Sequence, residues 1–164
     1  MKENCFTFFD EMGTSLRFVS EGIIEAEQDS ALAVLSPVGT EQNLNNRSIV
    51  FWLQLEEVSF LFTGDLELEG EQRLLRQYPE LQTDILKVGH HGSLTSSSPE
   101  FLERISPKLS LISAGRQNRF GHPHPEVLDH LEQHSISIYR TDLHGAVRLS
   151  LRQGRTKIET VQNE

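Results

Sequence analysis

The sequence predicts a layered α/β domain with a mixed sheet, and three observations support that prediction. Short apolar runs separated by polar turns fill the first half of the chain, as expected for hairpin-connected strands. In the second half, strand-like runs alternate with helical segments, the pattern that places parallel strands side by side. No repeat, low-complexity tract or linker divides the 164 residues, so we expect one domain over residues 1–164.

The first half is expected to hold two helices and five strands. The helices are a short one at residues 5–12 and a longer one at 67–77, which stops before Pro79. Glu56 and Glu57 form a two-residue turn between the last two strands, although this is not the usual turn pair. The strands are the apolar runs at 16–19, 23–26, 31–35, 48–55 and 58–63.

The second half adds two well-marked helices. Ser98, Pro99 and Glu100 give an N-cap, a proline at the first helical position and an acid near the positive helix end, so a helix should run from residue 98 to about residue 104. A second helix at 124–134 has its apolar residues on one face. Strands are expected at 84–88, 109–113, 136–140, 146–151 and 157–161.

Composition narrows the functional classes. The formal net charge of −9 argues against nonspecific adhesion to nucleic acid through a basic surface, but it does not exclude a phosphate held by bound metal ions. No apolar run approaches the roughly 20 residues of a membrane span, and no signal peptide is evident. The single cysteine, Cys5, excludes an internal disulfide and a cysteine-based zinc site, and we expect it to be a small apolar residue near a helix start.

Ligand-capable side chains follow four of the predicted strands. Loops beyond strand ends converge in α/β sheets, so these side chains can meet at one edge. Histidine and aspartate without cysteine suit a hydrolytic zinc or manganese site. The residues are Asp65, then His90 and His91, then His122 and His124, and finally Asp142 and His144, of which the last two are the least expected to reach a site.

Each of these residues also has a purely structural interpretation. Asp65 follows Gly64 and suits a turn or a helix cap. His122 and His124 each precede a proline, so they form either a rigid lead-in to the next helix or an anion site at its N-terminus. No GxSxG elbow is present, which disfavours a serine hydrolase.

Taken in order, four strings carry a more specific signal: TGDLE, LKVGHHGSLTSSSPEFL, PKLSLISAGRQNRFGHPHPEVLDHL and YRTDLHGAV. The chain resembles, colinearly from about residue 32 to residue 147, the C-terminal half of the metallo-β-lactamase-like domain of the DNA-internalisation competence proteins (ComEC family). The resemblance implies an αββα sandwich, incomplete at its N-terminal side, with mixed sheets, flanking helices and a two-metal site at one edge.

The resemblance also assigns roles to the candidate residues. Asp65 matches the aspartate that bridges two metals, and the His90–His91 pair matches the last metal-binding histidine, with His91 preferred. Where many superfamily members have a histidine, this chain has Asn46 and Ser48, which are weaker polar groups. Contacts to substrate, phosphate above all, are implied for His122, His124, Ser93, Asn46 and Ser48.

One expected motif is missing. The superfamily signature H-x-[HD]-x-D-H supplies most metal ligands, yet none of the seven histidines begins it; HPHPEV at 122–127 has proline and valine where Asp and His belong. The resemblance therefore implies a piece of a longer domain. With only Asp65 and one histidine as strong ligands, we expect this chain alone to bind metal weakly or not at all and to be inactive as a hydrolase.

The parent reaction implied is zinc- or manganese-dependent hydrolysis of a phosphodiester in nucleic acid. Two alternatives stay open: a metallohydrolase of phosphocholine esters, and a catalytically inactive binding module. The implied partners are nucleic acid, the missing N-terminal half of the domain and the membrane channel of a bacterial inner-membrane parent; the piece itself should be soluble. Uncovered apolar faces at 48–55 and 58–63 predict self-association as a possible homo-oligomer, which light scattering would detect.

Overall fold

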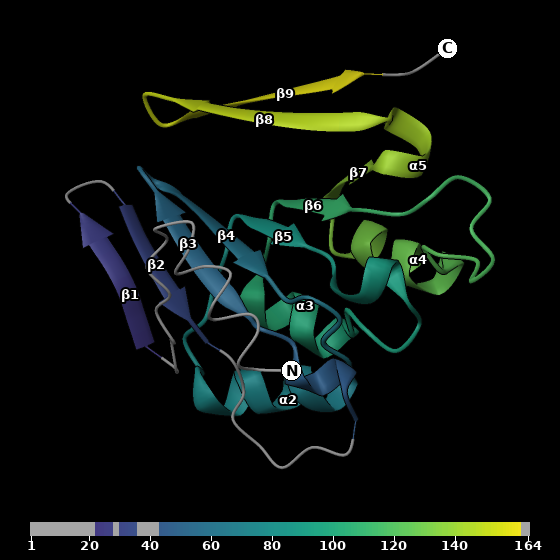
Figure 1. Cartoon of the computed structure of the whole chain (residues 1–164), viewed down its shortest axis with the longest axis horizontal. Helices are drawn as coiled ribbons and strands as arrows, with labels where there is room; N and C mark the ends of the chain where they lie inside the picture. Colours follow the sequence, from purple (N-terminus) through teal and green to yellow (C-terminus); the bar gives the residue numbers. More distant parts are fainter. Residues whose placement is uncertain (1–21, 28–29, 36–42, 162–164) are drawn as a thin grey trace, which may run out of the picture.

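A mixed seven-stranded sheet forms the centre of the molecule (Figure 1). The computed structural model describes residues 22–27, 30–35 and 43–161, so the helix expected at 5–12, the strand expected at 16–19 and Cys5 lie outside the described residues. The strands lie in chain order from one edge of the sheet to the other: β1 Gly22–Glu27, β2 Ser30–Val34, β3 Phe51–Leu55, β4 Val58–Phe62, β5 Ile85–Lys87, β6 Leu109–Ile112 and β7 Ser137–Arg140.

The pairing between neighbouring strands changes from antiparallel to parallel at β4. The pairs from β1 to β4 are antiparallel, with a two-residue turn between β3 and β4, and the pairs from β4 to β7 are parallel. This confirms the predicted change from antiparallel strands to strands that alternate with helices. Since β4, β5 and β6 run in one direction, the loops that follow them leave the sheet at the same edge. The turn between β3 and β4 is the predicted Glu56–Glu57 pair, and Glu56 adopts a positive φ of 51°.

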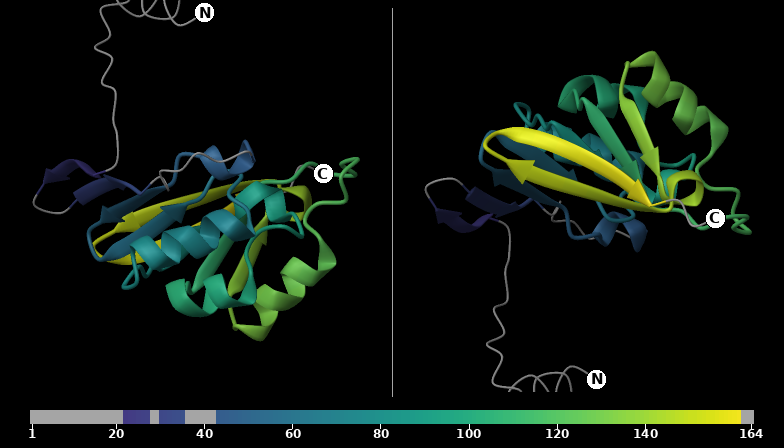
Figure 2. Two further views of the ribbon diagram at one scale, coloured as in Figure 1. Left: turned by 90° about the horizontal axis from the view of Figure 1, so that it is seen from below. Right: turned by 90° about the horizontal axis from the view of Figure 1, so that it is seen from above.

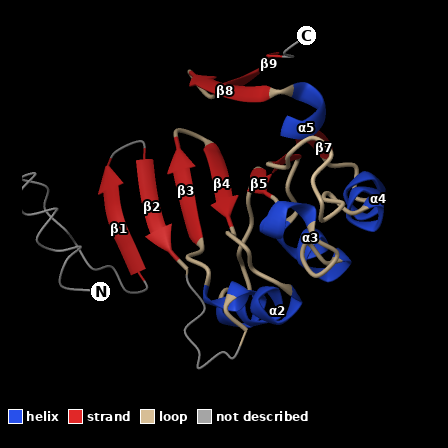
Figure 3. Cartoon of the chain, turned by 45° about the vertical axis from the view of Figure 1, so that its right-hand side comes forward, coloured by secondary structure: helices blue, strands red, loops and turns tan. Residues whose placement is uncertain are grey.

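Three helices pack on one face of the sheet: α2 Leu68–Gln77, α3 Pro99–Ile105 and α4 Pro125–Gln133 (Figures 1 and 3). Their inward residues, such as Leu74, Phe101 and Leu131, are almost completely buried against Leu61 and Leu86 of the sheet. This cluster is the main core, and its burial of large apolar side chains supplies most of the driving force for folding.

A two-stranded hairpin crosses the other face of the sheet (Figure 2). It consists of β8 Ala146–Arg152 and β9 Arg155–Val161, and the short helix α5 Thr141–His144 joins it to β7. Leu149, Leu151 and Ile158 of the hairpin pack against Val58 and Ile85, forming a second, smaller cluster. Helices, sheet and hairpin make a three-layered α/β arrangement, consistent with part of the predicted αββα sandwich.

One predicted strand is shorter than expected, and one short helix was not predicted. The strand expected at 48–55 begins only at Phe51, because Asn45–Arg47 forms a 3-10 turn and the Ser48 hydroxyl bonds to the backbone after β4 instead of facing a strand neighbour. Helix α5 was not expected, since four residues are too few to show a helical period. Within the described residues, no helix has both the length and the apolar character needed to cross a membrane.

Candidate functional site

The candidate site lies at the edge where β4, β5 and β6 end. Asp65 is in the turn from β4 to α2, and His90 and His91 are in the turn from β5 to α3. His122 and His124 belong to the long loop from β6 to α4. Because the three strands are parallel neighbours, these three connections are adjacent, as the sequence predicted.

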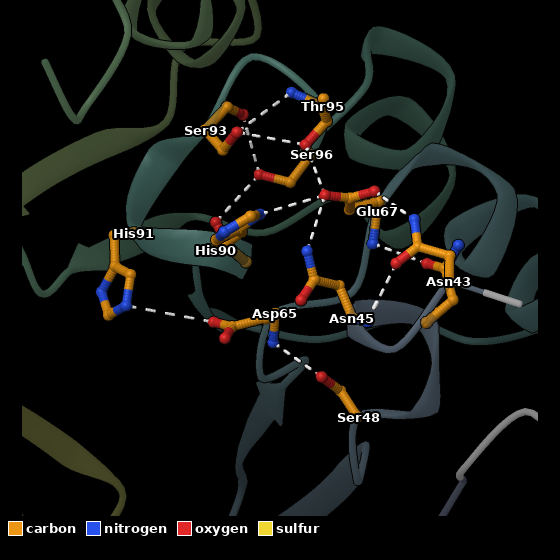
Figure 4. A network of polar contacts seen from close by, with 12 residues as sticks. Asn43, Asn45, Ser48, Asp65, Glu67, His90, His91, Ser93, Thr95 and Ser96 are labelled. Atoms are coloured by element: carbon orange, nitrogen blue, oxygen red, sulfur yellow. Dashed lines mark hydrogen bonds and ion pairs between the residues drawn. The ribbon is translucent and has the colours of Figure 1, made fainter. Parts of the chain in front are cut away.

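The two adjacent histidines point in different directions (Figure 4). His90 and His91 both adopt left-handed backbone angles, with φ of 46° and 56°, a conformation that non-glycine residues rarely take. The strained turn is fixed by hydrogen bonds from the His90 amide to the Gly64 carbonyl (3.0 Å) and from the Ser93 amide to the His90 carbonyl (2.9 Å). The turn therefore sends the His91 ring toward Asp65 and the His90 ring toward Glu67.

Asp65 and His91 face each other across an open edge. Asp65 Oδ1 lies 4.0 Å from His91 Nε2, and both side chains are about half exposed. Ser48 Oγ accepts a hydrogen bond from the Asp65 amide at 2.9 Å and fixes the turn. Ser113 O lies 2.7 Å from His91 Nδ1, and because a carbonyl oxygen only accepts, Nδ1 is the donor in this hydrogen bond and Nε2 is the ring nitrogen directed at Asp65.

Asp65 and His91 are side chains of the types that bind zinc, but two ligands are fewer than a zinc site needs. Zinc–nitrogen and zinc–oxygen bonds are about 2.0–2.2 Å long, so two donors on one tetrahedral zinc ion lie roughly 3.3–3.6 Å apart. The 4.0 Å between Asp65 Oδ1 and His91 Nε2 is longer, so the two side chains would have to move closer together to share one ion. A zinc site needs at least three protein ligands. Among the residues that the structure describes, no group of three His, Cys, Asp or Glu side chains is placed to hold a metal ion.

Glu67 is the most connected polar residue of the site, and sequence reasoning assigned it only to a helix start (Figure 4). Its carboxylate accepts hydrogen bonds from Asn43 (2.6 Å), Asn45 (2.9 Å) and Thr95 (3.0 Å). His90 Nδ1 lies 3.2 Å from Glu67 Oε1. Burial raises the pKa of Glu67, but these hydrogen bonds and the nearby imidazole outweigh it and leave the pKa below its usual value. In the sequence, only the asparagine-rich loop at 43–46, which supplies Asn43 and Asn45, could have indicated this network around Glu67.

Asn46 and Ser93 lie behind this network. Asn46 is almost fully buried, and its Oδ1 accepts the Glu67 amide at 2.9 Å. Its Nδ2 is buried with no hydrogen-bond partner among the described residues. Ser93 is buried too, and its hydroxyl lies 3.1 Å from Thr95 Oγ1. Both residues therefore support Glu67 from the protein side.

The loop after β6 brings His122 beside the histidine turn. The ring centroids of His122 and His90 are 5.8 Å apart. Burial lowers the pKa of His122, and the nearby imidazoles of His90, His91 and His124 lower it further. His124 Nδ1 accepts the Glu126 amide at 3.3 Å, so the ring of His124 caps α4, in agreement with the lead-in interpretation.

A pocket of about 260 Å³ opens between the two histidine-bearing segments. It lies directly beside the Asp65–His91 pair, since His91 belongs to both. The residues that line it are His91, Ser113, Ala114, Gly115, Asn118, Phe120 and His122. Sequence reasoning did not select Phe120 or Asn118.

Asp142 and His144 have local structural partners. Asp142 accepts two hydrogen bonds from the Arg140 guanidinium, at 3.0 and 2.5 Å, and this pairing lowers its pKa. His144 Nδ1 accepts the Arg140 amide at 2.9 Å. Both residues hold helix α5 in place.

Comparison with known proteins agrees with this arrangement. Residues 22–116, more than half of the chain, match the model of the Metallo-beta-lactamase superfamily. The chain belongs to this superfamily. The matched segment contains Asp65, His90 and His91, whereas the loop carrying His122 and His124 lies beyond it.

Curated relatives identify a narrower group within the metallo-β-lactamase superfamily. The chain is 42% identical over 139 residues to ComE operon protein 3 of Bacillus subtilis, covering 84% of this chain and 18% of that protein. It is 37% identical over 119 residues to Competence protein ComA of Neisseria gonorrhoeae (72% and 17%). With Recombination protein 2 of Haemophilus influenzae, identity is 34% over 120 residues (73% and 15%).

The resemblance to competence proteins is thereby confirmed. The chain is a metallo-β-lactamase domain that matches these proteins over a small part of their length, and it spans less than a fifth of each.

Proposed function

We propose that the chain is the part of a metal-dependent phosphodiesterase domain that supplies Asp65 and His91 to a metal site and lines the adjoining substrate pocket, with DNA handled during competence as the substrate. The observation that carries the proposal is the placement of the His91 ring. Its Nδ1 lies 2.7 Å from the Ser113 carbonyl oxygen, and its Nε2 faces Asp65 Oδ1 at 4.0 Å. A backbone-held imidazole opposite a carboxylate is a typical pair of metal ligands.

The surrounding contacts favour a division of labour between the two histidines. His91 is half exposed and directed at Asp65, so it is a better candidate ligand than His90, in line with the preference stated from the sequence. His90 is less exposed and contacts Glu67, so it supports the turn from the protein side. In such sites bound cations supply a hydroxide nucleophile and stabilise negative charge on the phosphate. His122 would face the phosphate from the opposite wall, while His124 is committed to capping α4.

Metal titration tests the ligand assignment on the chain itself. We expect isothermal titration with zinc or manganese to show weak binding that Asp65→Ala and His91→Ala each abolish. His130→Ala, on helix α4, is the control and should leave the titration unchanged. Tight binding of two ions per chain would contradict an incomplete ligand set, and binding insensitive to both site substitutions would contradict the assignment.

Hydrolysis requires a second experiment, on the chain joined to a preceding segment that carries the H-x-[HD]-x-D-H motif. We expect this longer protein to cleave DNA and the Asp65→Ala variant to lose cleavage by at least about 100-fold, the scale of a lost transition-state contact. Cleavage of a phosphocholine ester instead would favour the other hydrolase branch.

A non-enzymatic binding module is the second candidate function. The observation in its favour is the two-donor set at Asp65 and His91. Failure of the longer protein to cleave either ester, together with retained binding of DNA, would establish it.

A further inference from the structure

Phe120 is an exposed aromatic residue at the mouth of the candidate site. Its side chain is 65% exposed, although phenylalanine is usually buried. It lies in the loop between β6 and α4 and lines the same 260 Å³ pocket as His91 and His122. A single exposed apolar side chain is ordinary on a protein surface, and Phe120 differs from the others in that it lines the pocket beside His91 and His122.

Phe120 belongs to a stack of flat groups. The planes of Phe120 and His122 differ by 15°, with centroids 5.9 Å apart. The Arg119 guanidinium lies 4.7 Å from the Phe120 centroid. The Arg119 guanidinium lies over the Phe120 ring, so it extends the stack with a planar cation and adds positive charge to it. The Phe120 and His122 rings together with the Arg119 guanidinium suit a planar, weakly polar group that is linked to an anion.

Asn118 holds this stack in place. Its Oδ1 accepts the Phe120 and His122 amides at 3.2 and 3.0 Å. Its Nδ2 donates to the carbonyls of Gly115 (2.9 Å) and His122 (2.6 Å). Both donors and the acceptor of this side chain are therefore engaged within the loop. Asn118 fixes the ring positions and has no donor left to bind a ligand edge.

We propose that the pocket walled by Phe120 and His122 binds one nucleobase of a single-stranded nucleic acid by stacking, beside the phosphate that the Asp65–His91 edge would receive. The inference rests on the proposed function and deepens it by naming the strand form. A volume of 260 Å³ is below the roughly 300–1,000 Å³ of sites for larger ligands, so it suits a single ring system.

Two consequences follow from the chemistry of the pocket. Bases inside a duplex are stacked on each other, so only a single strand or a frayed end presents a free face to Phe120. Because the Asn118 amide is engaged internally, Asn118 does not bind base edges, and Phe120 contributes only a ring face. Binding should therefore tolerate any sequence.

Fluorescence anisotropy with metal removed by chelation tests stacking separately from hydrolysis. The probes are a labelled oligodeoxythymidylate, an abasic chain of equal length and a duplex, all at low salt. Phe120→Ala should weaken oligodeoxythymidylate binding by about 5-fold to 150-fold and leave abasic-chain binding unchanged. Phe120→Trp should retain or strengthen the binding. Leu143→Ala, which removes another exposed apolar side chain (54% exposed) from α5, is the matched control.

The inference is overturned if the native chain binds the abasic chain or the duplex as well as it binds the oligodeoxythymidylate, if it binds none of them, or if Phe120→Ala acts no more strongly than Leu143→Ala. Thermal unfolding of Phe120→Ala should match that of the native chain, since the side chain is exposed. Stacking that persists in a longer protein without hydrolytic activity would refute the proposed function and leave this inference standing.

Discussion

Two glutamates four residues apart, Glu67 and Glu71, show how surroundings set the charge of a side chain. Glu67 receives hydrogen bonds from Asn43, Asn45 and Thr95, and its pKa is lowered. Glu71 is almost fully buried within α2, and that burial raises its pKa to about 7 although the Ser97 and Ser98 amides donate to its two oxygens. The first is a fixed anion beside the site; the second changes charge near neutral pH.

Glu71 should make the stability of the chain depend on pH. Its folded pKa of about 7 lies above its usual 4.5. Between these values the folded state keeps the proton that the unfolded state has lost, so stability falls as pH rises from about 4.5 to about 7 and is level above. The total change is on the order of 3 kcal/mol. Urea unfolding of the native chain and of Glu71→Gln across this range should show that the native chain loses stability relative to the variant as pH rises.

Glu69→Gln is the control for that experiment, because Glu69 lies on the same helix but is exposed. Its pH profile should parallel the native one. A native profile parallel to that of Glu71→Gln would show that Glu71 is ionised throughout the range.

Individual side chains of the site were only partly predictable. Asp65 and His91 were found because histidine and aspartate after strands are recognisable residue types, and the structure places them 4.0 Å apart. Glu67 was missed because its partners Asn43 and Asn45 are more than 20 residues away in sequence. Phe120 was missed because a sequence does not reveal that a phenylalanine is exposed.

At the scale of elements, the site depends on the close approach of two loops. Gly92 ends the histidine turn, and a side chain there would lie 2.6 Å from Pro123 Cβ. The His124 amide donates to the Gly92 carbonyl at 2.8 Å. Only a glycine at position 92 lets the loop that carries His122 pack directly on the histidine turn.

Replacing Gly92 with alanine should separate the two loops. Gly92 has a φ of +80°, which strains any other residue, and the added Cβ would also collide with Pro123. We expect a loss of about 3 kcal/mol, of which roughly 1–2 kcal/mol is backbone strain. Gly121→Ala is the matched control: its φ is +69°, but nothing lies within 4 Å of the added Cβ. Equal losses in chemical unfolding would mean that packing on Pro123 is unimportant.

Most elements were predictable because their ends carry strong local signals. Ser98 and Pro99 marked the start of α3, and the Ser98 hydroxyl does accept the Phe101 amide. The start of β3 was placed three residues early because residues 48–50 are apolar enough to suit a strand, while Ser48 is drawn to Asp65 by a tertiary contact. Local pattern gave no sign of that contact.

At the scale of the whole molecule, the hairpin β8–β9 determines how the open face of the sheet is covered. Leu149, Leu151 and Ile158 are its contribution to the second cluster, opposite Val58 and Leu109. The sequence predicted both strands but not which face they would cross, since two amphipathic strands can pair on either side. The predicted self-association through 48–55 and 58–63 stays a prediction that light scattering can check.

The hairpin should stabilise the domain through its inward side chains alone. Ile158→Thr removes apolar surface from the cluster with Ile85 and should lower the free energy of unfolding by about 1–2 kcal/mol. Val161→Thr lies on the same strand but is 56% exposed, so it should change stability by less than about 0.5 kcal/mol. Urea unfolding of both variants measures the difference. If the two variants were equally stable, the hairpin would not be packed on the sheet, and the wall of the domain opposite the helices would have to be formed by another segment.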